Sequence, residues 1–264
     1  MNASSSLGEL ALAVLGTGEP AAKAAASRQG AATWAAGVVA LAHRPVPERP
    51  SRPPRPELCP PSAMPRRRAL TTPGGRIALL HALAHIEFNA IDLAWDIAAR
   101  FPGMPRAFYD DWIAVGADEA RHFVMLEERL AAFGATYGDL PAHDGLWQAA
   151  MDTADDLLAR LAVVPLVLEA RGLDVTPGMI ERLNRAGDET SAAILEVIYR
   201  EEVGHVAAGM RWFRHVCDER GLAPEATWKA IVARRFRGRV KPPFNQDARS
   251  RAGLPETYYA GEIL

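Results

Sequence analysis

The sequence predicts an all-α protein built around a four-helix bundle. Long segments with apolar residues at helical spacing occupy most of the chain between residues 72 and 221, and Gly or Pro follows each of them. No segment shows sustained alternation of apolar and polar residues with β-branched enrichment, so we expect no sheet. Two Glu-x-x-His motifs, Glu119–His122 and Glu202–His205, lie in the second and the fourth of these segments.

Caps and breakers set the limits of the four predicted helices. The first begins at the pair Thr72-Pro73, a good cap followed by a first-turn proline, and ends near Arg100. The others run from about Arg106 to Phe133, from about Asp144 to Arg171 and from about Asp188 to Arg220. A glycine directly follows each of these three. A short helix near residues 177–186, beginning at Thr176-Pro177, is expected between the third and the fourth.

Composition divides the rest of the chain into three further regions. Residues 1–43 are Ala-rich and predict a helical arm of two or three short helices. Residues 44–71 form a Pro-rich connector, because nine prolines fix φ and remove backbone donors there. It ends in Arg66-Arg67-Arg68, interpreted as solvated charge. Residues 72–221 hold the bundle, and residues 222–264 add a C-terminal helix (about Pro224 to Phe236) and a tail packed on it.

Several classes of protein are disfavoured by composition. The chain has 264 residues and a formal net charge of −2, so its surface as a whole is not a polyanion-binding surface. Its two cysteines give neither a disulfide framework nor a zinc spacing. The N-terminus lacks the positive flank of a signal peptide, and the longest apolar run there is too short for a bilayer. We therefore expect a cytoplasmic protein with no membrane contact.

The two Glu-x-x-His motifs belong to a longer repeat. Each has a single glutamate upstream, Glu87 before the first and Glu169 before the second. Glu87 and Glu119 are 32 positions apart, Glu169 and Glu202 are 33 apart, and His122 and His205 are 83 apart. This spacing indicates a duplicated helix pair.

Helical wheels place all four glutamates within the apolar stripe of their helices. A buried, unpaired carboxylate is unfavourable by several kcal/mol or stays protonated, so four of them need a shared explanation. Two metal ions supply one, because Glu and His at i and i+3 lie on one helical face. Six side chains are therefore candidate metal ligands: Glu87, Glu119, His122, Glu169, Glu202 and His205. The ordinary alternative to a metal site is that the motifs arose by chance and that the histidines are hydrogen-bonded core residues. The repeated spacing argues against it.

Other polar residues near the motifs allow two interpretations each. Asp118 and Glu201 either accept a hydrogen bond from a ligand imidazole or are half-exposed acids. Tyr199 is either a donor or redox-active phenol near the site or ordinary core. A second stripe on the first helix points away from Glu87 and is expected to face solvent or the Pro-rich connector, an interpretation favoured over a second ligand site; it comprises His81, His85, Asn89, Asp92 and Asp96. Small residues near the ligands, Gly116 among them, are expected to leave room for O2 or a substrate.

At these motifs the chain resembles the ferritin-like superfamily of di-metal carboxylate proteins, and more closely domain-of-unknown-function family 455. The matching stretches are His81–Asp92, Phe108–Trp112, Asp118–Phe123, Tyr137–Trp147, Leu168–Asp174 and Glu201–His205, and the likeness covers roughly residues 45–250. The resemblance implies a ferritin-like bundle with the six ligands named above. A related group in the superfamily hydroxylates a modified tRNA base, which makes oxygenation the leading analogy.

Three functions follow as expectations. The first is a non-haem di-iron oxidoreductase, an O2-dependent oxidase or hydroxylase acting on a small molecule or a modified nucleotide. The second is iron oxidation and storage, and the third is a non-catalytic metal-stabilised bundle, for which a homodimer is one arrangement. Oxygen and nitrogen ligands suit iron, with Mn/Fe and zinc as alternatives. The basic stretch Arg234–Lys241 permits contact with RNA, although cations that favour a helix C-terminus are the commoner explanation.

Overall fold

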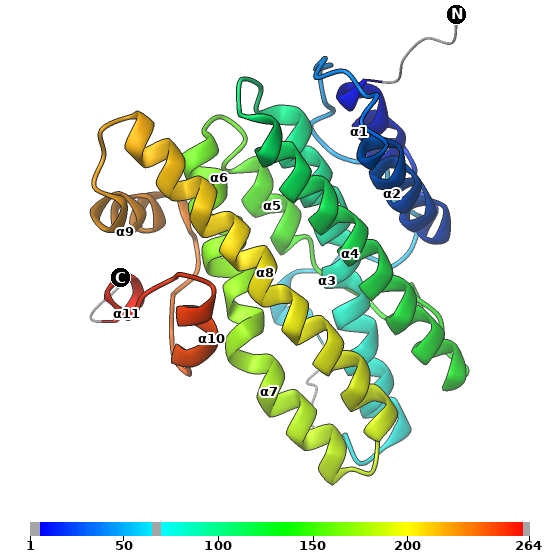
Figure 1. Cartoon of the computed structure of the whole chain (residues 1–264). Helices are drawn as coiled ribbons and strands as arrows, with labels where there is room; N and C mark the ends of the chain where they lie inside the picture. The colour runs from blue at the N-terminus through cyan, green and yellow to red at the C-terminus, as the bar shows by residue number, and fades with distance from the viewer. Residues whose placement is uncertain (1–5, 65–69, 261–264) are drawn as a thin grey trace, which may run out of the picture. The chain divides into compact units, whose positions relative to one another are not determined.

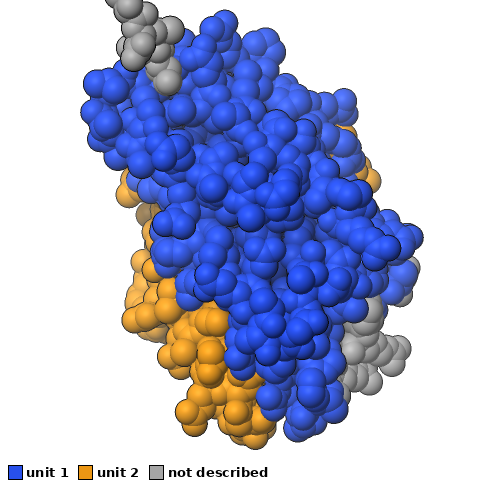
Figure 2. Space-filling view, turned by 90° about the vertical axis from the view of Figure 1, so that its right-hand side faces the viewer, with its two compact units in different colours: residues 1–147 blue, residues 148–264 orange. Residues whose placement is uncertain are grey.

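The computed structural model describes residues 6–64 and 70–260, and these ranges are helical with no β-strand (Figure 1). The all-α prediction is therefore confirmed, whereas the ferritin-like assignment and the four-region division stay predictions. The chain forms two compact units, Met1–Trp147 and Gln148–Leu264, which Figure 2 colours separately. Each unit is described here by itself.

The centre of unit 1 is a pair of long helices, α3 (Pro73–Arg100) and α4 (Arg106–Ala132). The Thr72 hydroxyl accepts a hydrogen bond from the backbone N–H of Gly75, so the predicted cap forms. The short connection after Arg100 turns the chain back, and the two helices make the most extensive contact of the unit. Both helices have the predicted limits to within one residue.

The N-terminal arm consists of α1 (Leu7–Leu15) and α2 (Pro20–Ala35). Helix α1 packs on α3, and α2 packs mainly on α4. Two glycines allow the close approach of these helices around the buried Trp95. A Cβ at Gly30 or at Gly116 would lie 2.9 Å or 2.8 Å from the Trp95 indole. The Trp95 indole therefore occupies the space beside Gly116, so the expectation of room for O2 or a substrate there is wrong.

The Pro-rich connector is extended, apart from a 3-10 turn at Pro61–Ala63. Backbone hydrogen bonds hold it to other parts of unit 1. Ser51 N–H donates to the Leu15 carbonyl at 2.7 Å, and Cys59 N–H donates to the Ala142 carbonyl at 2.8 Å. The connector is thus a fixed strap along unit 1. The run Arg66-Arg67-Arg68 lies outside the described residues.

Unit 2 contains the second long helix pair and the C-terminal helices. After α5 (Gly145–Met151), which spans the boundary of the units, come α6 (Leu157–Val163), a π-helical turn (Val164–Glu169), α7 (Ala170–Arg185) and α8 (Glu189–Glu219). They are followed by α9 (Pro224–Arg235), α10 (Gln246–Arg251) and α11 (Glu256–Tyr259). Helices α8 and α9 agree with their predicted limits, while α10 and α11 were not predicted.

The predicted third helix begins where expected, at Gly145, but it is interrupted and its predicted end is wrong. The chain leaves the helix after Met151, and Asp156 caps a new one by accepting a hydrogen bond from Leu158 N–H. The helix then continues through Gly172 and Pro177 to Arg185, so the separate short helix does not exist. An interior glycine is unfavourable by only about 1 kcal/mol, which tertiary packing of α7 on α8 outweighs.

Helix α3 is the one helix of the described residues that is long and apolar enough to cross a membrane by length and composition. However, 78% of its most apolar window is buried inside the protein. Core helices of globular proteins pass the same test, and the burial of α3 matches that explanation.

Candidate metal centre

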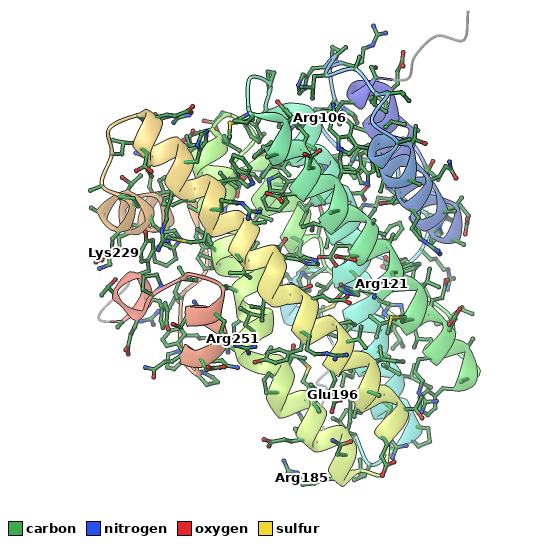
Figure 3. All side chains as sticks on the ribbon, in the orientation of Figure 1. Arg106, Arg121, Arg185, Glu196, Lys229 and Arg251 are labelled. Atoms are coloured by element: carbon green, nitrogen blue, oxygen red, sulfur yellow. The ribbon has the colours of Figure 1, made fainter. Side chains whose placement is uncertain are left out.

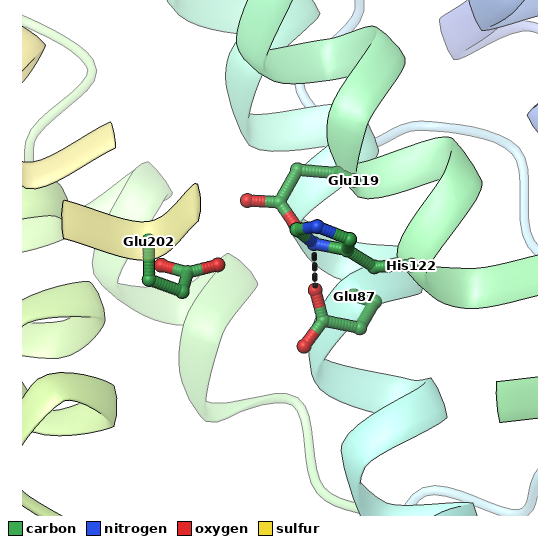
Figure 4. Close-up of side chains that lie close together, drawn as sticks. All are labelled: Glu87, Glu119, His122 and Glu202. Carbon is green, nitrogen blue, oxygen red and sulfur yellow. Dashed lines mark hydrogen bonds and ion pairs between the residues drawn. The ribbon is translucent and has the colours of Figure 1, made fainter. Parts of the chain in front are cut away.

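Three of the predicted ligands meet inside unit 1. Glu87 comes from α3, and Glu119 and His122 come from α4, with exposed fractions of 4%, 1% and 0%. A ligand atom from each lies within 4.8 Å of the other two. His122 Nδ1 is 3.3 Å from a Glu87 oxygen and 3.4 Å from a Glu119 oxygen (Figure 4). Figure 4 also draws Glu202, which belongs to unit 2.

Helix geometry explains why these residues meet. Glu87 lies 13 residues before the end of α3 at Arg100, and Glu119 lies 13 residues after the start of α4 at Arg106. Both are therefore about 20 Å from the connection between the helices, at 1.5 Å per residue. His122 follows Glu119 at i+3 and so shares its face. The 32-residue spacing of Glu87 and Glu119 thus corresponds to equal distances from the turn that joins their helices.

Two acids meet one base at this site. Burial, reinforced by the neighbouring Glu119 carboxylate, raises the pKa of Glu87 well above its ordinary value. Burial alone would lower the pKa of His122, but hydrogen bonds and charge from Glu119 and Glu87 raise it to about 11. One imidazole thus serves two buried carboxylates. A cation would relieve this imbalance, and two carboxylates with one imidazole form a donor set suited to iron, manganese or zinc.

Buried aromatic residues adjoin two of the ligands along the chain of unit 1. Phe88 and Phe123 directly follow the ligands Glu87 and His122, and both are fully buried. Their ring centroids are 5.4 Å apart, and each lies 5.3 Å from the ring of Tyr137. This packing joins α3, α4 and the segment that carries Tyr137.

In unit 2 the structure pairs Glu202 with His205, whose Nδ1 lies 3.4 Å from a Glu202 oxygen. His205 is 3% exposed, whereas Glu202 is half-buried. Glu169 is also half-buried and ends the π-helical turn. The expectation that all four carboxylates are fully buried thus holds for Glu87 and Glu119 and not for these two.

The π-helical turn before Glu169 was not predicted. Pro165 lies within it and lacks the N–H that a regular α-helix would use. Gly209 of α8 accommodates the turn, since a Cβ there would lie 2.5 Å from Pro165 Cβ. Single π turns occur often at functional sites, because they change which side chains face inward. A proline inside an apolar helical run was the available signal.

The remaining predicted site residues have other partners. Asp118 forms an ion pair with Arg121 at 2.8 Å. The Asp118 side chain is 39% exposed and the Arg121 side chain 40%, which matches the interpretation of Asp118 as a half-exposed acid. The Tyr199 hydroxyl accepts a hydrogen bond from Asn245 Nδ2 at 2.9 Å. Glu201 is half-buried in α8. The roles suggested for these three side chains stay predictions. Figure 3 shows Arg121 among all the side chains.

The second polar stripe of α3 is buried. The prediction that it faces solvent is therefore wrong, and the prediction that it faces the Pro-rich connector holds. Asp92 is 0% exposed; it contacts Lys23 of α2 and lies 2.9 Å from Arg52 of the connector. Arg52 also donates to Asn89 at 2.7 Å. Lys23 had no sequence signal beyond being one of two cations, with Arg28, in an Ala-rich helix. These contacts attach the arm and the connector to α3.

His85 belongs to this same buried stripe. Its Nδ1 lies 2.8 Å from the Tyr137 hydroxyl, and its Nε2 lies 3.0 Å from the His143 carbonyl. Burial lowers the pKa of His85 to about 4, so the ring is neutral at pH 7. Because Nε2 faces a carbonyl, it carries the proton, and Nδ1 accepts from Tyr137.

Comparison with known proteins identifies relatives. A family model described as "Protein of unknown function (DUF455)" matches residues 16–260. An uncharacterized protein of Haemophilus influenzae is 40% identical over 211 residues, covering 77% of this chain and 73% of its own. No solved structure matches. The family model covers most of the chain, including all six candidate ligands, and the chain therefore belongs to the DUF455 family.

Proposed function

We propose that the protein binds two metal ions, with iron as the favoured metal, and acts as an O2-dependent oxidase or hydroxylase. Glu87, Glu119 and His122 supply one half of the ligand set, and Glu169, Glu202 and His205 supply the other. The observation that carries the proposal is the burial of Glu87 and Glu119 together against a single histidine. The matching Glu202–His205 pair of unit 2 supports it.

The donor set accounts for the choice of metal and reaction. Glu-x-x-His pairs combined with two single glutamates are the inward-facing set of di-iron and di-manganese carboxylate bundles. Bound iron would supply redox chemistry with O2. The protein's own residues would hold the ligands and exclude water from the buried site. The substrate would be a small molecule or a modified nucleotide, as the family resemblance suggests.

Metal content tests the first part of the proposal. Protein purified from iron-supplemented cells should hold close to two metal ions per chain by elemental analysis. Glu119→Gln should lower this content, because it replaces an anionic ligand with a neutral one of the same shape. Glu128→Gln is the matched control, since Glu128 is an exposed glutamate on the same helix. Wild-type protein with well under one metal per chain would refute the proposal.

Ferrous titration under air separates the oxidase from an iron store. An enzyme site should stop oxidising iron at about two equivalents per chain, whereas a store continues far beyond. Gel filtration of the same sample provides a second reading. A shell-sized particle that accumulates iron would overturn the oxidase assignment in favour of storage.

A further inference from the structure

Positive charge is concentrated on one short segment of unit 2. Residues 234–241, here called the basic segment, contain five cations and no acid, although the whole chain has a net charge of −2. The cations are Arg234, Arg235, Arg237, Arg239 and Lys241. Such a local run is unexpected for a protein without a general excess of positive charge.

Favourable placement at a helix C-terminus explains only part of this run. Helix α9 ends at Arg235, so Arg234 and Arg235 lie in its last turn. The helix dipole acts within about one turn. Arg237, Arg239 and Lys241 lie beyond the helix end and need another explanation.

Ion pairs within unit 2 neutralise two of the five cations. Arg235 pairs with Asp155 at 2.7 Å, and Arg237 pairs with Asp152 at 2.8 Å. The three remaining cations are exposed and make no ion pair within residues 6–64 and 70–260; they are Arg234, Arg239 and Lys241. Three positive charges are thus available to a partner.

A scaffold within unit 2 holds the basic segment in place. The Trp228 indole of α9 donates to the Ala162 carbonyl at 3.2 Å, which anchors the helix. At the other end, Arg171 of α7 donates to the carbonyls of Lys241 and Pro243 at 2.8 Å and 2.9 Å. A surface hollow of about 460 Å³ opens beside the segment; Arg234, Arg235 and Arg237 line it together with Asp152 and Asp155, the ion-pair partners of Arg237 and Arg235. Figure 1 shows α9, in orange, from which the segment continues. A fixed backbone lowers the entropy lost when a partner binds.

We propose that the basic segment is a docking surface for single-stranded nucleic acid. Four of its five cations are arginines, whose planar guanidinium groups bind phosphate bidentately and stack on bases. Phe236 lies among them and is half-buried. Its ring lies against Gly238, where a Cβ would be 2.6 Å from Phe236 Cζ. Arginines beside an aromatic ring form the usual surface for phosphates and unpaired bases.

An anionic membrane is the less suitable partner. Stable attachment to a membrane surface needs exposed apolar side chains in addition to charge. The large exposed hydrophobic residues of the described chain are Val38, Leu41, Leu58, Ile86 and Leu222, and none of them lies in the basic segment.

Fluorescence anisotropy with a labelled oligouridine RNA of about 15 nucleotides tests the proposal on the full chain. Three free cations predict a slope of about −2 for log K against log salt, which is roughly a 20-fold loss between 50 and 200 mM salt. The triple variant Arg234→Ala, Arg239→Ala, Lys241→Ala should lose at least about tenfold in affinity and most of this slope. Phe236→Leu should weaken binding by about fivefold and leave the slope unchanged.

The control variant removes three positive charges from other parts of the chain. Arg28, Arg185 and Arg200 are exposed, and the triple alanine variant of these three should keep its affinity within about threefold. An equal loss in both triple variants would mean that only net charge matters and would overturn the proposal. Absence of binding at 50 mM salt would also overturn it, as would binding to phosphatidylserine vesicles without binding to RNA. Circular dichroism confirms that each variant is folded.

Discussion

The buried ion pair between Lys23 and Asp92 should be a major determinant of how firmly the N-terminal arm is attached. Both side chains are 0% exposed, and Asp92 also serves Arg52 at 2.9 Å. Removing one member of a buried pair is unfavourable by about 3–5 kcal/mol, because the other charge stays buried. Asp92→Asn leaves two cations without their anion and should lie at the upper end of that range. Lys23→Met leaves Asp92 with Arg52 and should lie at the lower end.

Urea unfolding followed by circular dichroism measures these free energies of unfolding, and limited proteolysis reports release of the arm. The double variant Lys23→Met, Asp92→Asn combines the two single changes and removes both charges of the pair. It should therefore be much less destabilised than the sum of the single variants, with a coupling energy of about 2 kcal/mol or more. Lys229→Met is the matched control, since Lys229 pairs with Glu225 at 2.7 Å on the surface (Figure 3).

The control should leave the unfolding midpoint essentially unchanged, because exposed pairs contribute little. The reasoning would be refuted if Asp92→Asn and the control had equal, small effects. It would also fail if the losses in the double variant were simply additive, because the two charges would then not depend on each other.

Three further predictions concern other parts of the molecule. Gly116→Ala should destabilise by about 1–3 kcal/mol in urea unfolding through overpacking against an indole, whereas Gly172→Ala, with open space around its Cβ, should be neutral or stabilising. Arg249→Met should destabilise by about 3–5 kcal/mol, because Arg249 is 2% exposed and holds Asp174 at 2.7 Å; Arg249→Lys should recover part of that loss. Removal of metal by a chelator should lower the thermal unfolding midpoint of the wild-type protein and leave that of Glu119→Gln unchanged. A ligand that binds only the folded state, at a free concentration 100 times its Kd, adds about 2.7 kcal/mol to the free energy of unfolding.

The long helices were predictable because their signals are local. Thr72 and Asp188 cap α3 and α8; Thr72 was predicted as a cap, and Asp188 was predicted as the start of its helix. The meeting of Glu87 with Glu119 was also predictable, because equal distances from a short turn bring two residues of a helix pair to the same height. Where the signal depended on a single glycine or proline, as at Gly172 and Pro177, the prediction failed. Packing of the whole helix outweighed those local preferences.

Sequence by itself determined the all-α class, the limits of three long helices and the repeated set of candidate ligands, since periodicity and spacing are properties of the chain. Only the tertiary structure decided where the polar stripe of α3 points and what it contacts. Asp92 is buried because Lys23, 69 residues earlier, and Arg52 lie against it. It also decided that Trp95, not a ligand, occupies the space beside Gly116. Contacts between distant residues depend on how whole helices pack, and no local pattern encodes them.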